Sequence, residues 1–261
     1  MGVEYCDADP KRNPEVVVRP IQAQLWTEGD RVVIYDAARL PAPAASLFDP
    51  AAFSERDLLD RGRGATFAVR LPSGEAVLRR YRRGGVVSRW LQDRYLWTGH
   101  TRARPIREFR LLAEALAAGL PVPRPLAAEA RRQGAYYTGS LLMARIADAR
   151  TLSGVLADAP DWQVVDWQAL GALLGRTHAL GFQHADLNAH NVMIDGAGRH
   201  WLIDWDRGQR RTLDRHWPTQ VLLRLQRSLR KLYAERASAS DARLGWQQLL
   251  AAHDSVLGAA R

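Results

Sequence analysis

The sequence predicts an α+β fold in which a small β-rich lobe precedes a larger, mainly helical lobe. Short β-type runs and a single helical segment fill the first part of the chain. Helical patterns dominate the second part, where only the short apolar runs "VMI" and "WLI" interrupt them. A chain of 261 residues is long enough for two such lobes. We therefore predict an N-terminal lobe over residues 1–148 and a C-terminal lobe over residues 149–261.

The strands expected in the first lobe are short apolar runs bounded by turn-forming residues, and they cover 15–20, 30–37, 65–71, 75–81 and 136–146. A Glu28-Gly29-Asp30 turn separates the first two strands, and residues 41–53 form a proline-marked connection. Because Pro72, Ser73 and Gly74 favour a tight turn, the next two strands are expected to form a hairpin.

One helix is expected in the first lobe, over residues 105–120. Pro105 suits its first turn, where a missing N–H needs no partner, and Gly119 suits its end. The apolar side chains that recur at helical spacing are Ile106, Phe109, Leu112 and Leu116. This helix, set among strands, completes an α+β lobe.

The second lobe is predicted to be mainly helical. Its helices are expected over 167–181, 217–236 and 245–257. Two short strands, 192–194 and 201–203, flank a turn that contains Asp195. A cleft between two lobes of this kind is a common place for a ligand.

The charge of the chain is strongly positive and is carried by arginine. The formal net charge is +9, and Lys11 and Lys231 are the only lysines. Biased codon use explains such a composition, but so does a phosphate or another anionic partner, which the arginine fork binds well. The single cysteine, Cys6, excludes an internal disulfide framework. We expect no secretory signal, because the N-terminus has no apolar core segment. We also expect no membrane-spanning segment, because no apolar run is long enough.

The residues that indicate chemistry lie between 184 and 206. Asp186 follows His184 by two positions, Asn191 follows Asp186 by five, and Asp204 ends the second short strand. Phosphoryl transfer from ATP needs a carboxylate near the acceptor hydroxyl and oxygen ligands for Mg²⁺. The order matches the kinase pattern H-x-D-x-x-x-x-N followed by a D-F-G-like triplet, which reads "DWD" here.

Further kinase-like parts occur upstream in the expected order. Gly62 and Gly64 form a Gly-x-Gly loop before a strand, where backbone amides would lie over phosphates, although a plain hairpin entrance also explains them. Arg79 occupies the position of the strand lysine of kinases, and Arg80 remains an alternative because successive strand residues face opposite ways. Glu108, early in the 105–120 helix, is the candidate carboxylate partner, although a first-turn helix charge needs no partner.

The chain resembles the lipopolysaccharide core kinases, and most closely their 3-deoxy-D-manno-octulosonic acid (Kdo) kinase branch. The resemblance spans about two thirds of the chain and rests on "VLRRYRRGG" (77–85), "REFRLLAEALAAGLPVPRP" (107–125), "HADLNAHNVMID" (184–195), "LIDWDRG" (202–208) and "LRLQRSLRKL" (223–232). It implies a protein-kinase-like two-lobe fold. It also implies phosphorylation of the Kdo 4-hydroxyl of a Kdo-lipid A precursor by ATP.

The resemblance assigns roles to individual residues. Asp186 would accept or orient the proton of the acceptor hydroxyl, and Asn191 and Asp204 would hold Mg²⁺ against the phosphates. Arg79 would neutralise the donor phosphates, and Glu108 would position Arg79. His184 and His190 are expected to be structural, Asp195 to be a turn residue, and His200 and Asp206 receive no role.

The acceptor and its location are also expectations from the resemblance. The arginines between 79 and 107 lie among aromatic and apolar residues, namely Trp90, Tyr95, Leu96 and Trp97. Such a mixture suits an anionic lipid surface. The 217–236 helix carries Arg224, Arg227, Arg230 and Lys231; it is either an ordinary surface helix or a peripheral membrane contact. The implied location is the cytoplasmic face of the bacterial inner membrane.

Three other functions are weighed against this one. A heptose kinase or an aminoglycoside-like phosphotransferase would share the same catalytic residues. A glycosyltransferase with a D-x-D metal site at 204–206 would leave the spacing of Asp186 and Asn191 unexplained. A nucleic-acid-binding protein is suggested only by the charge, and no recognition motif supports it, so no nucleic-acid partner is expected.

Overall fold

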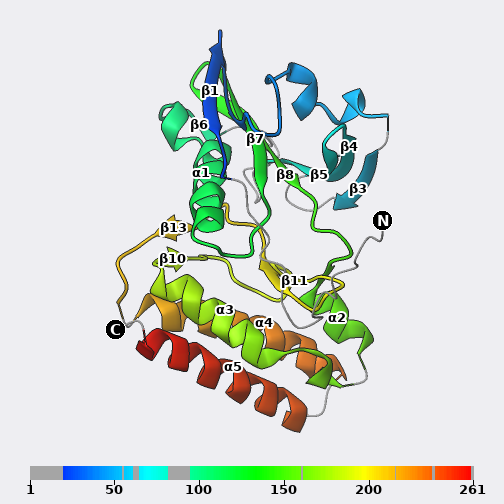
Figure 1. Cartoon of the computed structure of the whole chain (residues 1–261), viewed down its shortest axis with the longest axis vertical. Coiled ribbons are helices and arrows are strands. Elements are labelled where there is room, and N and C mark those ends of the chain that lie inside the picture. Colours follow the sequence, from blue (N-terminus) through cyan, green and yellow to red (C-terminus); the bar gives the residue numbers. More distant parts are fainter. Residues whose placement is uncertain are drawn as a thin grey trace, which may run out of the picture.

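The computed structural model describes residues 20–54, 56–60, 65–81, 95–159, 161–214, 216–236 and 239–259. A twisted sheet with one covering helix occupies one end of the molecule, and a group of helices occupies the other (Figure 1). The predicted α+β class is therefore confirmed. No helix in the described part of the chain is both long and apolar enough to cross a bilayer.

The large sheet is built from antiparallel strands early in the chain. Its members are β1 (Ala23–Glu28), β2 (Arg31–Asp36), β3 (Arg56–Asp60), β4 (Thr66–Leu71), β5 (Gly74–Arg80), β6 (Tyr95–Leu96), β7 (Pro125–Gln133) and β8 (Tyr136–Ala144). The order across the sheet is β1-β2-β7-β8-β5-β4-β3, and β6 adds to β8. Two 3-10 turns, Ala45–Phe48 and Pro50–Ala52, lie in the predicted proline-marked connection.

The predicted hairpin over 65–81 is confirmed as β4 and β5, which pair from Thr66 with Arg79 to Leu71 with Gly74. β2 lies between β7 and β1, and the sequence did not predict β1. The strand predicted at 15–20 lies outside the described residues. β7 was also missed, because its alanines favour a helix locally. Those alanines, Ala127, Ala128 and Ala130, are fully buried, so packing overrides the local preference.

The predicted helix in the first lobe is α1 (Arg104–Ala117), which packs on β7 and β8. Ile106 and Phe109 are fully buried, and Gly119 leaves the helix with a φ of 73°. Gly139 on β8 brings the strand close to the start of α1, because a Cβ there would lie 2.6 Å from Pro105 Cγ. The sheet therefore fixes the position of the first turns of α1, which carry Glu108.

The second part of the chain consists of α2 (Leu152–Asp158), α3 (Trp167–Ala179), α4 (Trp217–Arg236) and α5 (Ala239–Ala259). It also holds short elements, namely β9 (Arg150–Thr151), a 3-10 turn at Trp162–Val164, β10 (Phe182–Gln183), β11 (Val192–Ile194), β12 (His200–Leu202) and β13 (Gln209–Arg210). The helix prediction over 217–236 is confirmed residue for residue. The other two helices differ only at their ends.

The core is continuous between the two parts. One cluster of buried side chains runs from the α1 face of the sheet through Phe182 and Trp205 to α3 and α4. Gly171 and Gly175 let α3 lie directly against the backbone of α5, with His253 O only 2.7 Å from where a Cβ of Gly175 would be. The boundary predicted at residue 148 falls between β8 and β9, and it stays a prediction.

Candidate active site

Asp186 lies on the loop between β10 and β11. The side-chain amides of Asn188 and Asn191 each donate a hydrogen bond to its backbone carbonyl at 2.9 Å. These bonds fix the backbone of Asp186 and do not engage its carboxylate. The Asp186 side chain is 49% exposed, so it is accessible from solvent.

Asp204 follows β12 and lies beside Asn191. The N–H of Ile203 donates to Asn191 O at 3.0 Å, and the carbonyl of Ile203 accepts from the His184 ring at 2.8 Å. Asp204 itself has a φ of 61°, in the left-handed region that few non-glycine residues other than Asn and Asp adopt. The loop and the end of β12 thus bring Asp186 and Asp204 into one region, although they lie eighteen positions apart in the sequence.

His184 contributes to this arrangement as a buried hydrogen-bonding residue. Its side chain is buried against the Trp205 ring, whose centroid lies 4.7 Å from that of the imidazole. Burial lowers the pKa of His184, although the nearby Ile203 carbonyl, Asp204 and Asp186 oppose that shift. A neutral ring that donates to Ile203 O ties the Asp186 loop to the segment that carries Asp204.

A buried ion-pair cluster joins the sheet, α1 and Asp204. The guanidinium of Arg79, on β5, pairs with Glu108 on α1 and with Asp204. Tyr81 donates its hydroxyl to the same Glu108 carboxylate and accepts from Arg79 at 2.9 Å. The other Glu108 oxygen accepts from the Trp205 N–H at 3.1 Å. The sequence predicted Arg79, Glu108 and Asp204, but it gave no signal for Tyr81.

The pKa values in this cluster reflect burial and mutual attraction. Burial alone would lower the pKa of Arg79, but Glu108, Tyr81 and Asp204 together raise it well above its ordinary value. Burial raises the pKa of Glu108, whose side chain is 0% exposed, and Arg79 opposes that rise. Burial and Glu108 likewise raise the pKa of Tyr81 well above its usual value. Arg79 therefore stays positively charged and is held in place by the Glu108 carboxylate.

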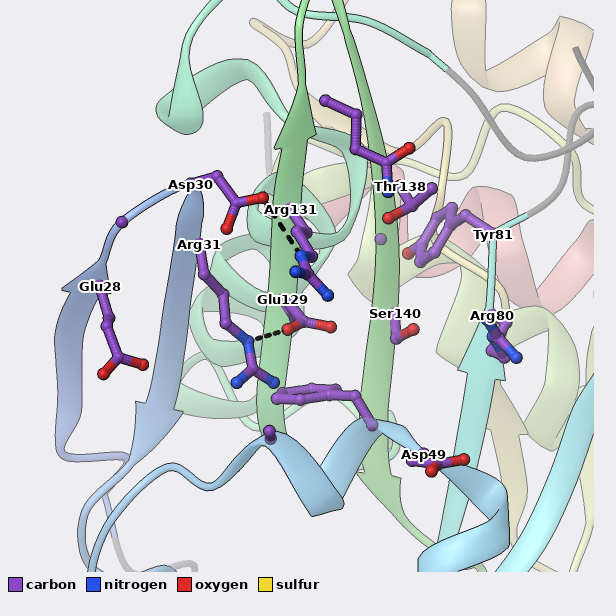
Figure 2. A pocket seen from close by; sticks show the side chains of 15 residues that line it. Glu28, Asp30, Arg31, Asp49, Arg80, Tyr81, Glu129, Arg131, Thr138 and Ser140 are labelled. Atoms are coloured by element: carbon purple, nitrogen blue, oxygen red, sulfur yellow. Dashed lines mark hydrogen bonds and ion pairs between the residues drawn. The ribbon is translucent and has the colours of Figure 1, made fainter.

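Arg80 lies on the opposite face of the sheet from Arg79, because successive residues of β5 face opposite ways. It lines a groove with a volume of about 690 Å³, together with Arg31, Glu129 and Ser140 (Figure 2). Figure 2 shows Arg31 reaching Glu129 across the strands, with Arg80 at the far side of the groove. This groove is on the face of the sheet opposite α1, whereas Arg79 pairs with Glu108 on α1 and with Asp204.

The "DWD" triplet has a buried centre and a paired end. Trp205 is buried and donates its ring N–H to Leu202 O at 3.0 Å. Asp206 pairs with Arg104 at the start of α1, with Arg104 Nε donating to Asp206 Oδ1 at 2.7 Å. Arg104 also lies over the ring of Tyr95, 4.8 Å from its centroid. Asp206, for which the sequence assigned no role, is thus a structural link between the triplet and α1.

Arg224 on α4 contacts Asp186, which the sequence did not predict. Its guanidinium donates to Asp186 Oδ1 at 2.9 Å, and both side chains are about half exposed. One helical turn further, Ser228 accepts from the Ala189 N–H at 3.1 Å. The same face of α4 therefore holds the backbone of the loop that carries Asp186 and places a cation beside the Asp186 carboxylate.

Three further polar residues of this region are Asp195, His190 and His200. Asp195 accepts bonds from the turn amides of Ala197 and Arg199 and from the Trp201 ring, which confirms it as a turn residue. His190 bonds to Ser153 Oγ at 2.8 Å. His200 is buried on β12, and burial lowers its pKa. Gly62 and Gly64 lie outside the described residues, in the connection between the paired strands β3 and β4.

The oxygen atoms of Asn191 and Asp204 suit a hard cation. The described residues contain no group of three or more His, Cys, Asp or Glu side chains placed to hold a metal. Mg²⁺ commonly takes one or two protein oxygens and completes its shell with water and phosphate. Because the Asn191 amide nitrogen is engaged with Asp186 O, the amide oxygen is the atom left for a ligand. The donor set therefore fits a metal bound together with a nucleotide.

Comparisons with known proteins give a family match and similar relatives. Residues 55–253 match the lipopolysaccharide kinase (Kdo/WaaP) family. A protein of Xanthomonas oryzae pv. oryzae (strain PXO99A) described as 3-deoxy-D-manno-octulosonic acid kinase is 41% identical over 232 residues, covering 88% of this chain and 92% of the relative. A protein of Xylella fastidiosa (strain M23) with the same description is 39% identical over 237 residues, covering 89% and 94%.

A solved structure described as WaaP in complex with acyl carrier protein is similar in fold. Its TM-score is 0.51 at 15% sequence identity, and the match covers 77% of this chain and 79% of that one. At this identity the likeness concerns the fold alone. It confirms the kinase-like architecture that the sequence predicted.

Proposed function

Because the chain belongs to the lipopolysaccharide kinase (Kdo/WaaP) family, we propose that it transfers the γ-phosphoryl group of ATP to the 4-hydroxyl of Kdo in a Kdo-lipid A precursor. The relatives described as Kdo kinases support this acceptor over a heptose or an aminoglycoside. The observation that carries the proposal is the joining of Arg79 to both Glu108 and Asp204, beside the loop of Asp186.

Arg79 would bind the donor phosphates in this reaction. Its guanidinium is held from one side by Glu108 and from the other by Asp204, so its position is set before the nucleotide arrives. A fixed cation stabilises the charge that develops during transfer without having to reorganise.

Asp186 would accept the proton of the acceptor hydroxyl. The two asparagine amides that hold its backbone restrict the direction of its carboxylate. Asn191 and Asp204 would hold Mg²⁺, and that ion, when bound, neutralises charge on the β- and γ-phosphates. The hydrogen bond from Ile203 to Asn191 keeps these two ligands beside each other.

A peripheral contact with an anionic membrane is part of the proposal, at the cytoplasmic face of the bacterial inner membrane. Arg102, just before α1, and Arg107, on α1, are exposed, and Leu96 on β6 is 60% exposed. On α4, Arg227 and Lys231 are exposed along the helix face that begins at Arg224. Cations and exposed apolar side chains of this kind attract anionic lipid headgroups.

An acceptor assay tests the reaction. The purified protein is given ATP and Mg²⁺ with a Kdo-lipid A precursor, a heptosylated core or an aminoglycoside. We expect phosphate on the first, and NMR of the product should place it on the 4-hydroxyl. Asp186→Ala should abolish transfer while the thermal unfolding curve stays near that of the unmodified protein. Phosphate on heptose or on the aminoglycoside alone would overturn the proposal.

A vesicle assay tests the location. The protein is mixed with neutral vesicles and with vesicles containing anionic lipid, at low and at raised salt. We expect sedimentation only with anionic vesicles and release as salt rises, because screening shortens the reach of surface charges. Equal recovery from both vesicle types at every salt concentration would contradict a membrane contact through these cations.

A further inference from the structure

Arg224 is the one side chain that contacts the Asp186 carboxylate within the described part of the chain. The contact joins a single guanidinium nitrogen to a single carboxylate oxygen at 2.9 Å. The rest of the arginine fork has no partner among the described residues, and the two side chains are 48% and 49% exposed. An ion pair this open to water is weak and easily exchanged.

The backbone of Arg224 is held in place by α4, although its guanidinium is about half exposed to solvent. Leu225 and Leu229 on the same helix are fully or almost fully buried, and Ser228 bonds to the catalytic loop. The helix therefore cannot shift without disturbing both the core and the backbone beside Asp186. A free arginine fork is thus held at a constant place next to the carboxylate that meets the acceptor hydroxyl.

The chemistry of the acceptor supplies a partner for this fork. A sugar acid carries its carboxylate on the same ring as its reactive hydroxyl, so the two groups are separated by no more than the width of one ring. When the hydroxyl lies at Asp186, a carboxylate on that ring falls within the reach of a cation beside Asp186. Arginine binds carboxylates through two parallel hydrogen bonds, which fixes orientation as well as position.

We propose that Arg224 is the residue that recognises the carboxylate of the acceptor sugar, and that it exchanges Asp186 for this carboxylate when the acceptor binds. The inference rests on the proposed function, because it requires a sugar acid as acceptor. The exchange frees Asp186 Oδ1 for the hydroxyl proton at the moment when the hydroxyl arrives. An uncharged sugar of the same shape leaves Arg224 on Asp186 and is a poor acceptor.

The test compares two acceptors in each of three proteins. The acceptors are a lipid-free Kdo glycoside and the same compound with its carboxylate converted to a carboxamide, so that membrane contact plays no part. The proteins are the unmodified chain, Arg224→Gln and Arg230→Gln. Arg230 provides the matched control, because it is exposed on the same helix and its substitution removes the same charge without touching Asp186.

We expect the unmodified protein and Arg230→Gln to prefer the acid over the amide by roughly 10- to 100-fold in kcat/KM, the effect of a hydrogen-bonded charge. Arg224→Gln should show a ratio near one. Because the ratio is taken within each protein, a partly inactive preparation does not alter it. Calorimetric binding of both compounds gives the same ratio if turnover of Arg224→Gln is too slow to follow.

Two outcomes would overturn the inference while leaving the proposed function intact. One is an unmodified protein that phosphorylates acid and amide equally well, and the other is Arg224→Gln that keeps the full preference. Failure of the unmodified protein to phosphorylate either Kdo glycoside, with transfer to a heptose instead, would contradict the proposed function and the inference together. The three results are distinct, so the two claims are tested separately.

Discussion

The backbone N–H of Trp205 donates a hydrogen bond to Glu108 Oε1, while Glu108 Oε2 binds Arg79 and Tyr81. One buried carboxylate therefore connects the α1 helix, the sheet and the segment that carries Asp204. If the two parts of the chain move relative to each other, this carboxylate is where the movement reaches the site.

Glu108→Gln should impair both stability and transfer. A glutamine side chain has one oxygen, so its NH₂ group must face either the Trp205 N–H or the donors Arg79 and Tyr81. A buried donor without an acceptor costs about 1–3 kcal/mol. We expect a free energy of unfolding lower by about that amount, measured with urea, and kcat lower by roughly 10- to 100-fold. Unchanged kcat would show that Arg79 needs no positioning by Glu108.

The same substitution should impair transfer strongly at Arg79 and only slightly at its neighbour Arg80. Arg79→Gln removes the cation that faces Asp204, so kcat/KM for ATP should fall by roughly 100-fold or more. Arg80→Gln removes the same charge from the other face of the sheet and should change kcat/KM by less than about 3-fold. Steady-state kinetics on the two variants decides the assignment, and a larger loss for Arg80→Gln would reverse it.

The Arg104–Asp206 pair should stabilise the contact between α1 and the "DWD" segment. Arg104→Ala and Asp206→Ala are compared with the double variant by urea unfolding. Because the pair is bidentate and partly buried, we expect a coupling energy of about 1–2 kcal/mol. Additive single effects would mean that the pair contributes nothing beyond its separate residues.

The free energy of unfolding should fall as the pH falls, because of His178. This ring is buried on α3 against His253 and Trp217, and its Nδ1 bonds to His253 Nε2 at 2.9 Å. Burial, together with the nearby His253 and His184, lowers the pKa of His178 to about 3. Between that value and its ordinary pKa, the unfolded chain binds a proton that the folded chain does not. The free energy of unfolding is therefore highest above the ordinary pKa and falls as pH falls through this window.

The size of this effect is measurable. This one ring should remove about 2 kcal/mol of stability between pH 7 and pH 5. In His178→Gln, which does not titrate, the loss over the same interval should shrink by that amount in urea unfolding. His216→Gln, which removes an exposed ring, is the control and should retain the full loss. An equal loss in all three proteins would assign the acid sensitivity elsewhere.

The sequence predicted those site residues whose spacing along the chain follows the kinase pattern. Asp186, Asn191 and Asp204 lie on one stretch with two short strands, so the local pattern brings them together. Arg79 and Glu108 followed from their order along the chain. The strand β7 was missed for the opposite reason, because its alanines show no strand preference until a helix and a second strand bury them.

Contacts between distant segments could not be read from local patterns. Arg224 reaches Asp186 across 38 positions, and Arg104 reaches Asp206 across 102. The sequence of a basic amphipathic helix does not distinguish the arginine that contacts Asp186 from the arginines one turn away. Tyr81 was not predicted for a related reason. Its hydroxyl joins the site only because the fold brings Glu108, on α1, next to it.

The left-handed backbone of Asp204 has a consequence for how its variants are interpreted. Asn tolerates this conformation nearly as well as Asp, whereas an Ala residue there costs about 1 kcal/mol in backbone strain. The usual alanine substitution therefore alters the shape of the loop and removes the carboxylate in one step. Asp204→Asn separates the two, because it keeps the turn and the side-chain volume and loses only the charge. Asp204→Asn is therefore the more informative variant. Inactivity of Asp204→Ala alone does not show whether the lost charge or the altered loop is the cause.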